Sequence, residues 1–258
     1  MKLAVSGKGG VGKTTISALI ALSLRDLGRK VIAIDADPDS NLLACMGYPE
    51  PESVPPLVEL KDFIAERTGV KPGTTGGMYK LNPKVDDIPE KYAVEVDGIK
   101  VLVAGAVKKG GTGCYCPENA LVRALVSHLL LDDNTSLILD MEAGIEHLGR
   151  GTIGSVDRLL VIVEPGRRSV ETALRIVGLA KDLNLTKVSA IGNRIRSEDD
   201  KALLKKALPD IEFVGFVPYD ERLREAEVAG RSVVGASEDV DKAIAEIVAK
   251  IATKSPRH

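Results

Sequence analysis

The amino-acid sequence predicts a single α/β domain, residues 1–258, with a mostly parallel, twisted sheet covered by helices on both faces. Strand-like apolar runs alternate with segments of helical spacing, which is the pattern of βαβ units. The runs at 31–34 and 159–163 are apolar without interruption, as expected for strands that are buried on both faces. A chain of 258 residues is also long enough to bury a large core without disulfides.

The expected strands and helices alternate along most of the chain. Strands are predicted at residues 2–6, 30–35, 99–104, 136–140, 158–163, 187–192 and 212–217, and helices at 14–27, 57–67, 118–131, 169–182, 198–207 and 220–229. Residues 93–101 read as a β-hairpin that turns at Asp97-Gly98. Residues 69–90 are rich in Gly and Pro, and we expect a surface insertion there. A last helix at 238–253 gathers its apolar residues on one face, and we expect it to pack against the sheet.

Composition argues against several classes of partner. The formal net charge of −2 provides no field that would attract nucleic acid or an anionic membrane. Aromatic residues make up 3% and Trp is absent, so platforms for stacking single-stranded bases are not expected. Three cysteines do not form a disulfide framework, and no apolar run reaches the ~18 residues of a membrane helix. We therefore expect a cytoplasmic protein that binds neither nucleic acid nor membrane.

A phosphate-binding loop stands between the first predicted strand and the first predicted helix. Gly7-Lys8-Gly9-Gly10-Val11-Gly12-Lys13-Thr14 fits G-x-x-x-x-G-K-[ST]. Its glycines let backbone N–H groups point into one concavity, and the helix N-terminus adds positive potential. Lys13 is expected on the β- and γ-phosphates, and the Thr14 hydroxyl on Mg²⁺. The expected ATP-binding residues here are Gly7, Lys8, Gly9, Gly10, Val11, Gly12, Lys13, Thr14 and Thr15.

Acidic residues follow two further predicted strands. Asp35 and Asp37 come after one strand and Asp140 after another, at the edge where a parallel sheet gathers its ligands. Asp140 is expected to hold magnesium through water, and Asp35 or Asp37 to order the attacking water. Each aspartate alone has a plain structural alternative, a helix N-cap. Three of them at strand ends beside a phosphate-binding loop favour a magnesium-dependent ATP hydrolase.

The second residue of the loop indicates a family. With Lys8 the loop reads K-G-G-x-G-K-T, which resembles the deviant Walker A motif of the MinD/ParA/nitrogenase-iron-protein class of dimeric P-loop ATPases. The resemblance implies that Lys8 reaches across a twofold interface to the nucleotide of the partner subunit. It also implies that Asp37, in Asp35-Ala36-Asp37-Pro38, orients the hydrolytic water and contributes to the magnesium site with Thr14 and Asp140. Asp37, Lys8 and Lys13 are thus the expected catalytic residues.

The resemblance extends to the base of the nucleotide and to a narrower group. It implies an adenine pocket made by Asn193, at the end of a late strand, and by Pro218, after the next strand; an ordinary turn residue is the alternative for Asn193. Within the class, the chain is most similar to the CooC family of accessory ATPases, which assist nickel insertion into carbon monoxide dehydrogenase. Three stretches carry this similarity: residues 113–119, 142–151 and 164–173.

A pair of cysteines lies in the expected loop at 105–117. In an extended segment the side chains of Cys114 and Cys116 point the same way, so both sulfurs can face one ion. Two thiolates do not complete a tetrahedral or square-planar site, but a twofold dimer doubles them to four on its axis. We expect Ni²⁺ or Zn²⁺ there, in a homodimer promoted by ATP or by metal. Two cysteines that are adjacent by coincidence are the alternative.

The sequence leaves more than one function open. The first is a metallochaperone ATPase whose partner is the carbon monoxide dehydrogenase apoenzyme, or the related acetyl-CoA synthase. The second is a MinD- or ParA-like ATPase of spatial organisation, against which the missing basic tail and basic excess argue. The third is an electron-transfer iron–sulfur ATPase, which needs a cluster cysteine just after Asp140; residues 143–147 contain none. Sulfur ligation does not specify which metal is native.

Overall fold

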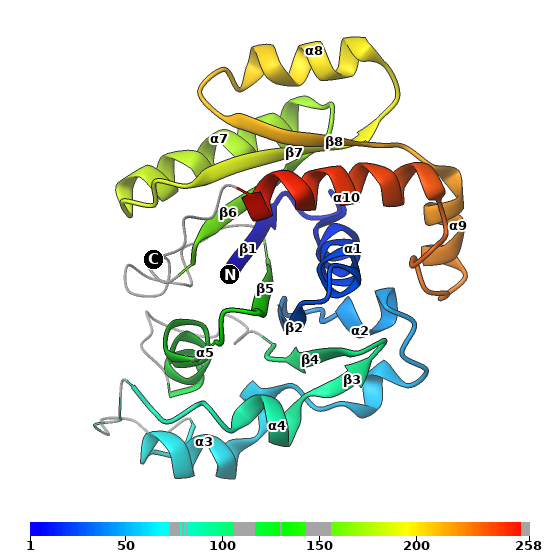
Figure 1. Ribbon diagram of the computed structural model, residues 1–258. Coiled ribbons are helices and arrows are strands. Elements are labelled where there is room, and N and C mark those ends of the chain that lie inside the picture. The colour runs from blue at the N-terminus through cyan, green and yellow to red at the C-terminus, as the bar shows by residue number, and fades with distance from the viewer. Residues whose placement is uncertain are drawn as a thin grey trace.

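The computed structural model describes residues 1–72, 78, 80, 82–105, 117–129, 131–142 and 156–253. Figure 1 shows one continuous twisted sheet with helices packed on either side of it. The described strands are β1 (Lys2–Gly7), β2 (Lys30–Ala36), β3 (Val94–Val96), β4 (Ile99–Val103), β5 (Thr135–Met141), β6 (Arg158–Val163), β7 (Val188–Ile195) and β8 (Glu212–Pro218). Every predicted strand is present, and its ends lie within one residue of those expected except in β7, which continues three residues further.

The sheet has the order β3-β4-β2-β5-β1-β6-β7-β8. All neighbours pair in parallel except β3 and β4, which form the antiparallel hairpin at one edge. The hairpin turns at Asp97 and Gly98, both with positive φ, because that turn matches the twist of the strands. This confirms the predicted α/β class with a mostly parallel sheet. The carboxyl ends of β1, β2, β5, β6 and β7 therefore meet along one edge.

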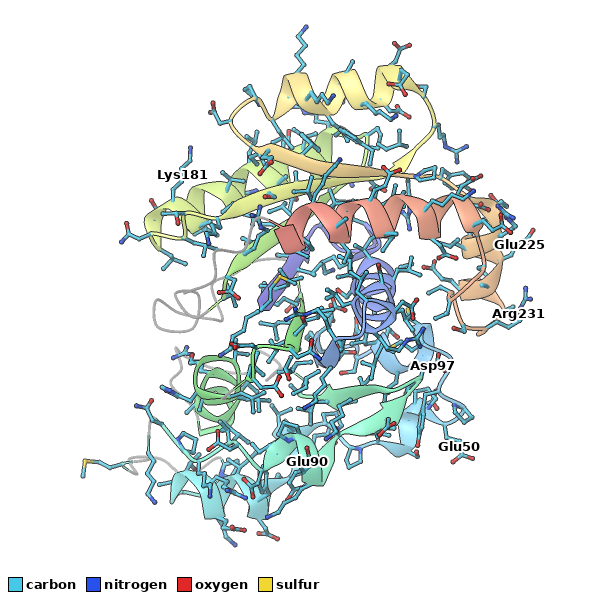
Figure 2. All side chains as sticks on the ribbon, viewed as in Figure 1. Glu50, Glu90, Asp97, Lys181, Glu225 and Arg231 are labelled. Carbon is cyan, nitrogen blue, oxygen red and sulfur yellow. The ribbon has the colours of Figure 1, made fainter. Side chains whose placement is uncertain are left out.

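The helices cover both faces of the sheet. They are α1 (Lys13–Asp26), α2 (Leu42–Cys45), α3 (Lys61–Thr68), α4 (Ile88–Tyr92), α5 (Pro117–His128), α7 (Arg167–Asp182), α8 (Glu198–Ala207), α9 (Glu221–Val228) and α10 (Glu238–Thr253), with short 3₁₀ turns at Pro51–Ser53 and Leu57–Glu59. Helices α1, α2 and α10 share one buried cluster, and α3, α5, α7 and α8 share another on the opposite face. Charged side chains such as Glu90, Lys181 and Glu225 point outward (Figure 2).

The last helix packs as the sequence predicts. Val240, Ile244, Ile247, Val248 and Ile251 are at most 1% exposed, and α10 lies against β8 and α1. Its apolar face is thus used within the fold. Among the described residues, no helix is both long enough and apolar enough to cross a bilayer.

The segment expected to be a surface insertion, residues 69–90, is only partly superficial. Val85 and Ile88 are at most 1% exposed and belong to the core cluster beneath α3 and α5. Arg67 of α3 holds the segment by donating to the carboxylate of Asp87 (2.7 Å). The sequence pattern missed this because α4 is five residues long, too short to show a helical period. Residues 73–77, 79 and 81 lie outside the described residues.

Candidate nucleotide site

The phosphate-binding loop joins β1 to α1 in the middle of the sheet. Its backbone folds back where the N–H of Val11 donates to the carbonyl of Lys8 (3.2 Å), and α1 begins where the N–H of Ile16 donates to Gly12 (3.0 Å). Gly12 has φ 92°, and a Cβ there would lie 2.5 Å from Nδ2 of Asn193. Only glycine suits both the left-handed backbone and the close approach.

A cavity of about 650 Å³ opens in front of this loop. The loop contributes Gly9, Gly10, Gly12, Lys13, Thr14 and Thr15 to its walls, and the chain after β2 contributes Asp37. Lys13 is 6% exposed, and its Nζ lies 4.0 Å from Oδ2 of Asp37. The structure thus brings together the expected phosphate-binding lysine and the expected catalytic aspartate.

Asp140 and Asp35 lie buried at the ends of β5 and β2, paired in register. Oδ1 of Asp140 accepts from the Ser17 hydroxyl (3.1 Å), whereas its Oδ2 is buried without a hydrogen-bond partner. Burial raises the pKa of Asp140 to about 6, although the Thr14 hydroxyl and the Lys13 ammonium act in the opposite direction. A buried carboxylate oxygen without a partner, beside the Thr14 hydroxyl, fits an oxygen-preferring cation such as Mg²⁺.

Asp35 does not have the role that the sequence suggested, which was to order the attacking water. Its Oδ1 accepts from the N–H of Asp37 (3.1 Å) and its Oδ2 from the N–H of Leu42 (2.9 Å). Burial and the neighbouring Asp140 carboxylate raise the pKa of Asp35 to about 7. Both oxygens are used to hold the two ends of the turn at 37–41. Asp35 therefore positions Asp37, and of the two it is Asp37 whose carboxylate faces the phosphate cavity.

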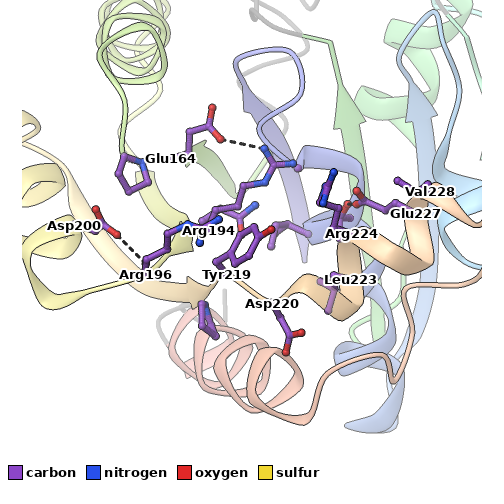
Figure 3. Close-up of a pocket in the computed structure, with 16 residues that line it drawn as sticks. Glu164, Arg194, Arg196, Asp200, Tyr219, Asp220, Leu223, Arg224, Glu227 and Val228 are labelled. Atoms are coloured by element: carbon purple, nitrogen blue, oxygen red, sulfur yellow. Dashed lines mark hydrogen bonds and ion pairs between the residues drawn. The ribbon is translucent and has the colours of Figure 1, made fainter.

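A second cavity of about 650 Å³ adjoins the first and is lined by Asn193 and Pro218 (Figure 3). The Asn193 amide donates to the carbonyl of Val11 (2.8 Å), so the end of β7 is tied to the phosphate-binding loop. The Arg196 guanidinium stacks 3.6 Å above the Tyr219 ring. The structure thus places the two expected adenine-pocket residues in one cavity that continues into the phosphate cavity.

The sequence analysis assigned no role to three charged residues of the site, which are Glu164, Arg194 and Glu227. Glu164, just after β6, lies 3.6 Å from Nζ of Lys8 and 3.1 Å from a guanidinium nitrogen of Arg194. Glu227 of α9 accepts from the Thr15 hydroxyl (2.5 Å). Glu164 shares a signal with Asp35 and Asp140, since it too follows an apolar strand. Arg194 and Glu227 have no such signal, because sheet topology and the return of α9 place them.

Cys114 and Cys116 lie outside the described residues. The described chain stops at Gly105 before this pair and resumes at Pro117 after it. The N–H groups of Ala104 and Gly105 donate to the carbonyl of Asp35 (2.8 and 3.1 Å), and α5 begins at Pro117. The last described residue before the cysteine pair, Gly105, is therefore anchored to Asp35, the residue that positions Asp37. Within the described residues, no three His, Cys, Asp or Glu side chains converge as a metal site.

Taken together, the geometry suits a nucleoside triphosphate with its phosphates on the loop and its base between Asn193 and Pro218. Comparison with known proteins identifies a nucleotide-binding family. Residues 2–233 match the model of the CobQ/CobB/MinD/ParA nucleotide binding domain. The chain is 45% identical to carbon monoxide dehydrogenase accessory protein CooC of Rhodospirillum rubrum, over 90% of this chain and 89% of that protein. It is 44% identical to an uncharacterized ATP-binding protein of Methanocaldococcus jannaschii, over 90% and 91% of the two chains.

Solved structures show the same fold. MinD in the MinC:MinD cell division complex of Aquifex aeolicus superposes with a TM-score of 0.70 at 22% identity, covering 100% of this chain and 98% of that one. MinD of Pyrococcus horikoshii, complexed with Mg-ADP, gives 0.68 at 19% identity over 97% and 95%. The chain belongs to the CobQ/CobB/MinD/ParA family of nucleotide-binding P-loop ATPases, and CooC is one of its relatives there.

Proposed function

We propose that this protein is a magnesium-dependent, homodimeric ATPase that binds Ni²⁺ or Zn²⁺ through Cys114 and Cys116 and assists nickel insertion into carbon monoxide dehydrogenase. The observation that carries the proposal is the 45% identity to CooC over 90% of the chain. The Cys-Tyr-Cys sequence adds chemistry suited to a soft or borderline metal. The likeness to MinD structures, at 22% identity or less, extends to the fold alone.

ATP hydrolysis would divide its roles among the residues of the phosphate cavity. Lys13 binds the β- and γ-phosphates, and Asp37 orients the water that attacks the γ-phosphate. Thr14, Asp37 and the unpartnered oxygen of Asp140 would hold Mg²⁺, and the ion would supply positive charge to the phosphates. Asp35 fixes the turn that carries Asp37 through its two backbone hydrogen bonds.

The contacts of Gly105, the last described residue before the cysteine pair, support a coupling between nucleotide and metal. Gly105 is anchored to the carbonyl of Asp35, and the Asp35 carboxylate is anchored to the N–H of Asp37. Two hydrogen bonds therefore connect Asp37 to Gly105 through Asp35. A shift of Asp37 on hydrolysis would be transmitted to Gly105 along them. Because two protomers are needed for four thiolates, nucleotide state would control metal affinity through dimerisation.

A role in spatial organisation, as in MinD- or ParA-like proteins, is less well supported. Such a role needs a surface for membrane or DNA, and the apolar face of α10 is buried against β8 and α1. The net charge of −2 gives no general attraction to anionic surfaces.

Metal stoichiometry tests the proposal. Equilibrium dialysis with Ni²⁺ should give one ion per two chains for the wild type and strongly weakened binding for Cys114→Ser and Cys116→Ser. The matched control is Cys45→Ser, because Cys45 is a half-buried thiol whose pKa burial raises to about 12. One ion per chain, or unchanged affinity in Cys114→Ser, would refute the shared site.

Dimerisation tests the role of Lys8. Light scattering with a non-hydrolysable ATP analogue, without added metal, should show dimers for Asp37→Ala and monomers for Lys8→Ala. A lysine from each side offsets the repulsion between two sets of phosphates that face each other. If the two variants behave alike, Lys8 does not act across an interface. Co-purification with carbon monoxide dehydrogenase apoenzyme, compared with acetyl-CoA synthase, identifies the partner.

A further inference from the structure

Arg194 has a backbone conformation that its sequence does not explain. It lies in β7 with φ 57°, in the left-handed region, which costs a residue other than glycine roughly 1–2 kcal/mol. The β7–β8 ladder is irregular between Gly192 and Ile195, and Arg194 is exposed between buried neighbours. Such a backbone persists only where surrounding contacts enforce it, and this is common at ligand sites.

Contacts on both sides of Arg194 enforce the conformation. The preceding Asn193 donates through its amide to the carbonyl of Val11 (2.8 Å). The carbonyl of the following Ile195 accepts from the N–H of Tyr219 (2.9 Å). The strand is thus tied to the phosphate-binding loop on one side of Arg194 and to the end of β8 on the other. The bulge between these ties carries the Arg194 side chain over the nucleotide site.

Arg194 stands where the two cavities meet. The residues that line both cavities are Gly12, Thr15, Arg194 and Glu227, and Arg194 is the cation among them. A nucleotide with its base near Asn193 and its terminal phosphates near Lys13 passes this junction with its ribose and α-phosphate. Lys13, deeper in the phosphate cavity, serves the phosphates farther from the base.

The Arg194 guanidinium has a partner in this structure that an anion can replace. It lies 3.1 Å from Glu164 (Figure 3), and Nζ of Lys8 lies 3.6 Å from the same carboxylate. The side chains of Arg194 and Glu164 are 42% and 23% exposed, and ion pairs this accessible to water contribute little to stability. A nucleotide phosphate, which accepts two parallel hydrogen bonds from a guanidinium, is the stronger partner. An ion pair with Glu164 alone would not require a left-handed backbone.

We propose that Arg194 binds the α-phosphate of the nucleotide, and that Glu164 holds the guanidinium at the mouth of the site until the phosphate takes it over. This inference rests on the ATP binding proposed above and adds a ligand outside the phosphate-binding loop. It also explains the strained bulge in β7. In a regular strand the Arg194 side chain would lie on the face of the sheet opposite to that of Asn193.

The test is ADP affinity, measured by calorimetry on the monomeric protein. Arg194→Ala should weaken ADP binding about tenfold, with a smaller loss in Arg194→Lys, which keeps the charge without the planar fork. The loss should shrink as salt rises, because it is electrostatic. Arg167→Ala is the matched control, an exposed arginine paired with Glu171 on α7. ADP affinity within twofold of wild type in Arg194→Ala, or a loss unaffected by salt, would overturn the assignment.

Two further variants separate binding from folding. Arg194→Gly should fold and melt at a higher temperature than Arg194→Ala, since glycine accepts φ 57°, yet it should lose the same tenfold in ADP affinity. Glu164→Gln should bind ADP as tightly as wild type or up to about threefold more tightly, because a competing partner is gone. Glu171→Gln removes the same charge elsewhere as a control. Weaker ADP binding in Glu164→Gln would contradict the role given to Glu164. If the wild type binds no ADP, the proposed ATPase function fails, independently of Arg194.

Discussion

The two halves of the nucleotide site are built in different ways. In the phosphate half, Lys13, Asp35 and Asp140 are at most 6% exposed, and the backbone of one continuous loop forms the wall. From the junction of the two cavities towards the base, exposed side chains such as Arg194 and Glu227 come from β7 and α9 and are held by ion pairs and single hydrogen bonds. Buried charges are costly to leave without partners, whereas exposed pairs are cheap to lose. Substitutions should therefore act sharply in the phosphate half and gradually in the base half.

The largest effect is expected at Lys13. Lys13→Ala should weaken ATP binding by about a hundredfold or more, because a buried ammonium that contacts the phosphates is lost. A fluorescent ATP analogue measures the change by titration. Lys30→Ala is the matched control, since Lys30 is an exposed lysine paired with Asp132 at the start of β2. ATP binding within threefold of wild type in Lys13→Ala would show that the phosphates lie elsewhere.

In the same phosphate half, substitution of Asp37 should lower the rate of ATP turnover and leave ATP binding nearly unchanged. Asp37→Ala should keep ATP affinity within a few-fold of wild type and lower kcat by about 10²–10⁴, the range for a group that acts on the attacking nucleophile. Steady-state phosphate release measures kcat. Asp39→Ala, two residues on and exposed, should retain most activity. Normal phosphate release from Asp37→Ala would remove Asp37 from the mechanism.

Asn193 lines the base cavity and is tied by its amide to the phosphate-binding loop, so we expect an intermediate effect there. Its amide N–H₂ donates to Val11, which leaves the amide oxygen to accept from the amino group of adenine. Asn193→Ala should weaken ATP binding about tenfold, reduce the preference for ATP over GTP, and lower the free energy of unfolding by about 1 kcal/mol for the lost hydrogen bond. Competition between ATP and GTP measures the preference. An unchanged ATP-to-GTP ratio would place the base outside this cavity.

The same contrast explains which parts of the site the sequence reveals. The phosphate half depends on one contiguous motif and on aspartates that follow apolar strands, so residues 7–15, Asp37 and Asp140 are visible without a structure. Glu164 and Arg194 lie 30 residues apart in the chain, and Thr15 and Glu227 lie 212 apart. No local pattern indicates those contacts, because the sheet order and the β7 bulge create them.

The helices and strands likewise differ in how well the sequence predicts them. Long periodic or apolar segments, such as β6 and α10, were predicted with nearly correct ends. Short elements, such as α2 and α4, have too few residues to show a period. Val85 and Ile88 are buried by tertiary packing beneath α3 and α5. The segment that contains them is rich in Gly and Pro, so its sequence does not indicate this burial. Asn193 and Pro218 could be predicted only through the family resemblance.

The smallest effect concerns Cys45, which lines the phosphate cavity together with Glu227. Burial, together with the negative charge of the Glu227 carboxylate, raises the pKa of the Cys45 thiol to about 12. The thiolate is the reactive form, and at a pH below the pKa its fraction falls about tenfold for each pH unit. Alkylation at pH 8 should therefore be very slow, and it should still accelerate at pH 10.

Glu227→Gln removes a negative charge, lowers the pKa of Cys45 and so increases the thiolate fraction. Alkylation of Cys45 by iodoacetamide, measured by mass spectrometry in a Cys114→Ser/Cys116→Ser background, should become about threefold faster. Glu225→Gln on the same helix is the control, since Glu225 points outward (Figure 2). Equal rates in the two glutamine variants would show that Glu227 does not face the junction, and a rate that levels off below pH 9 would contradict the raised pKa.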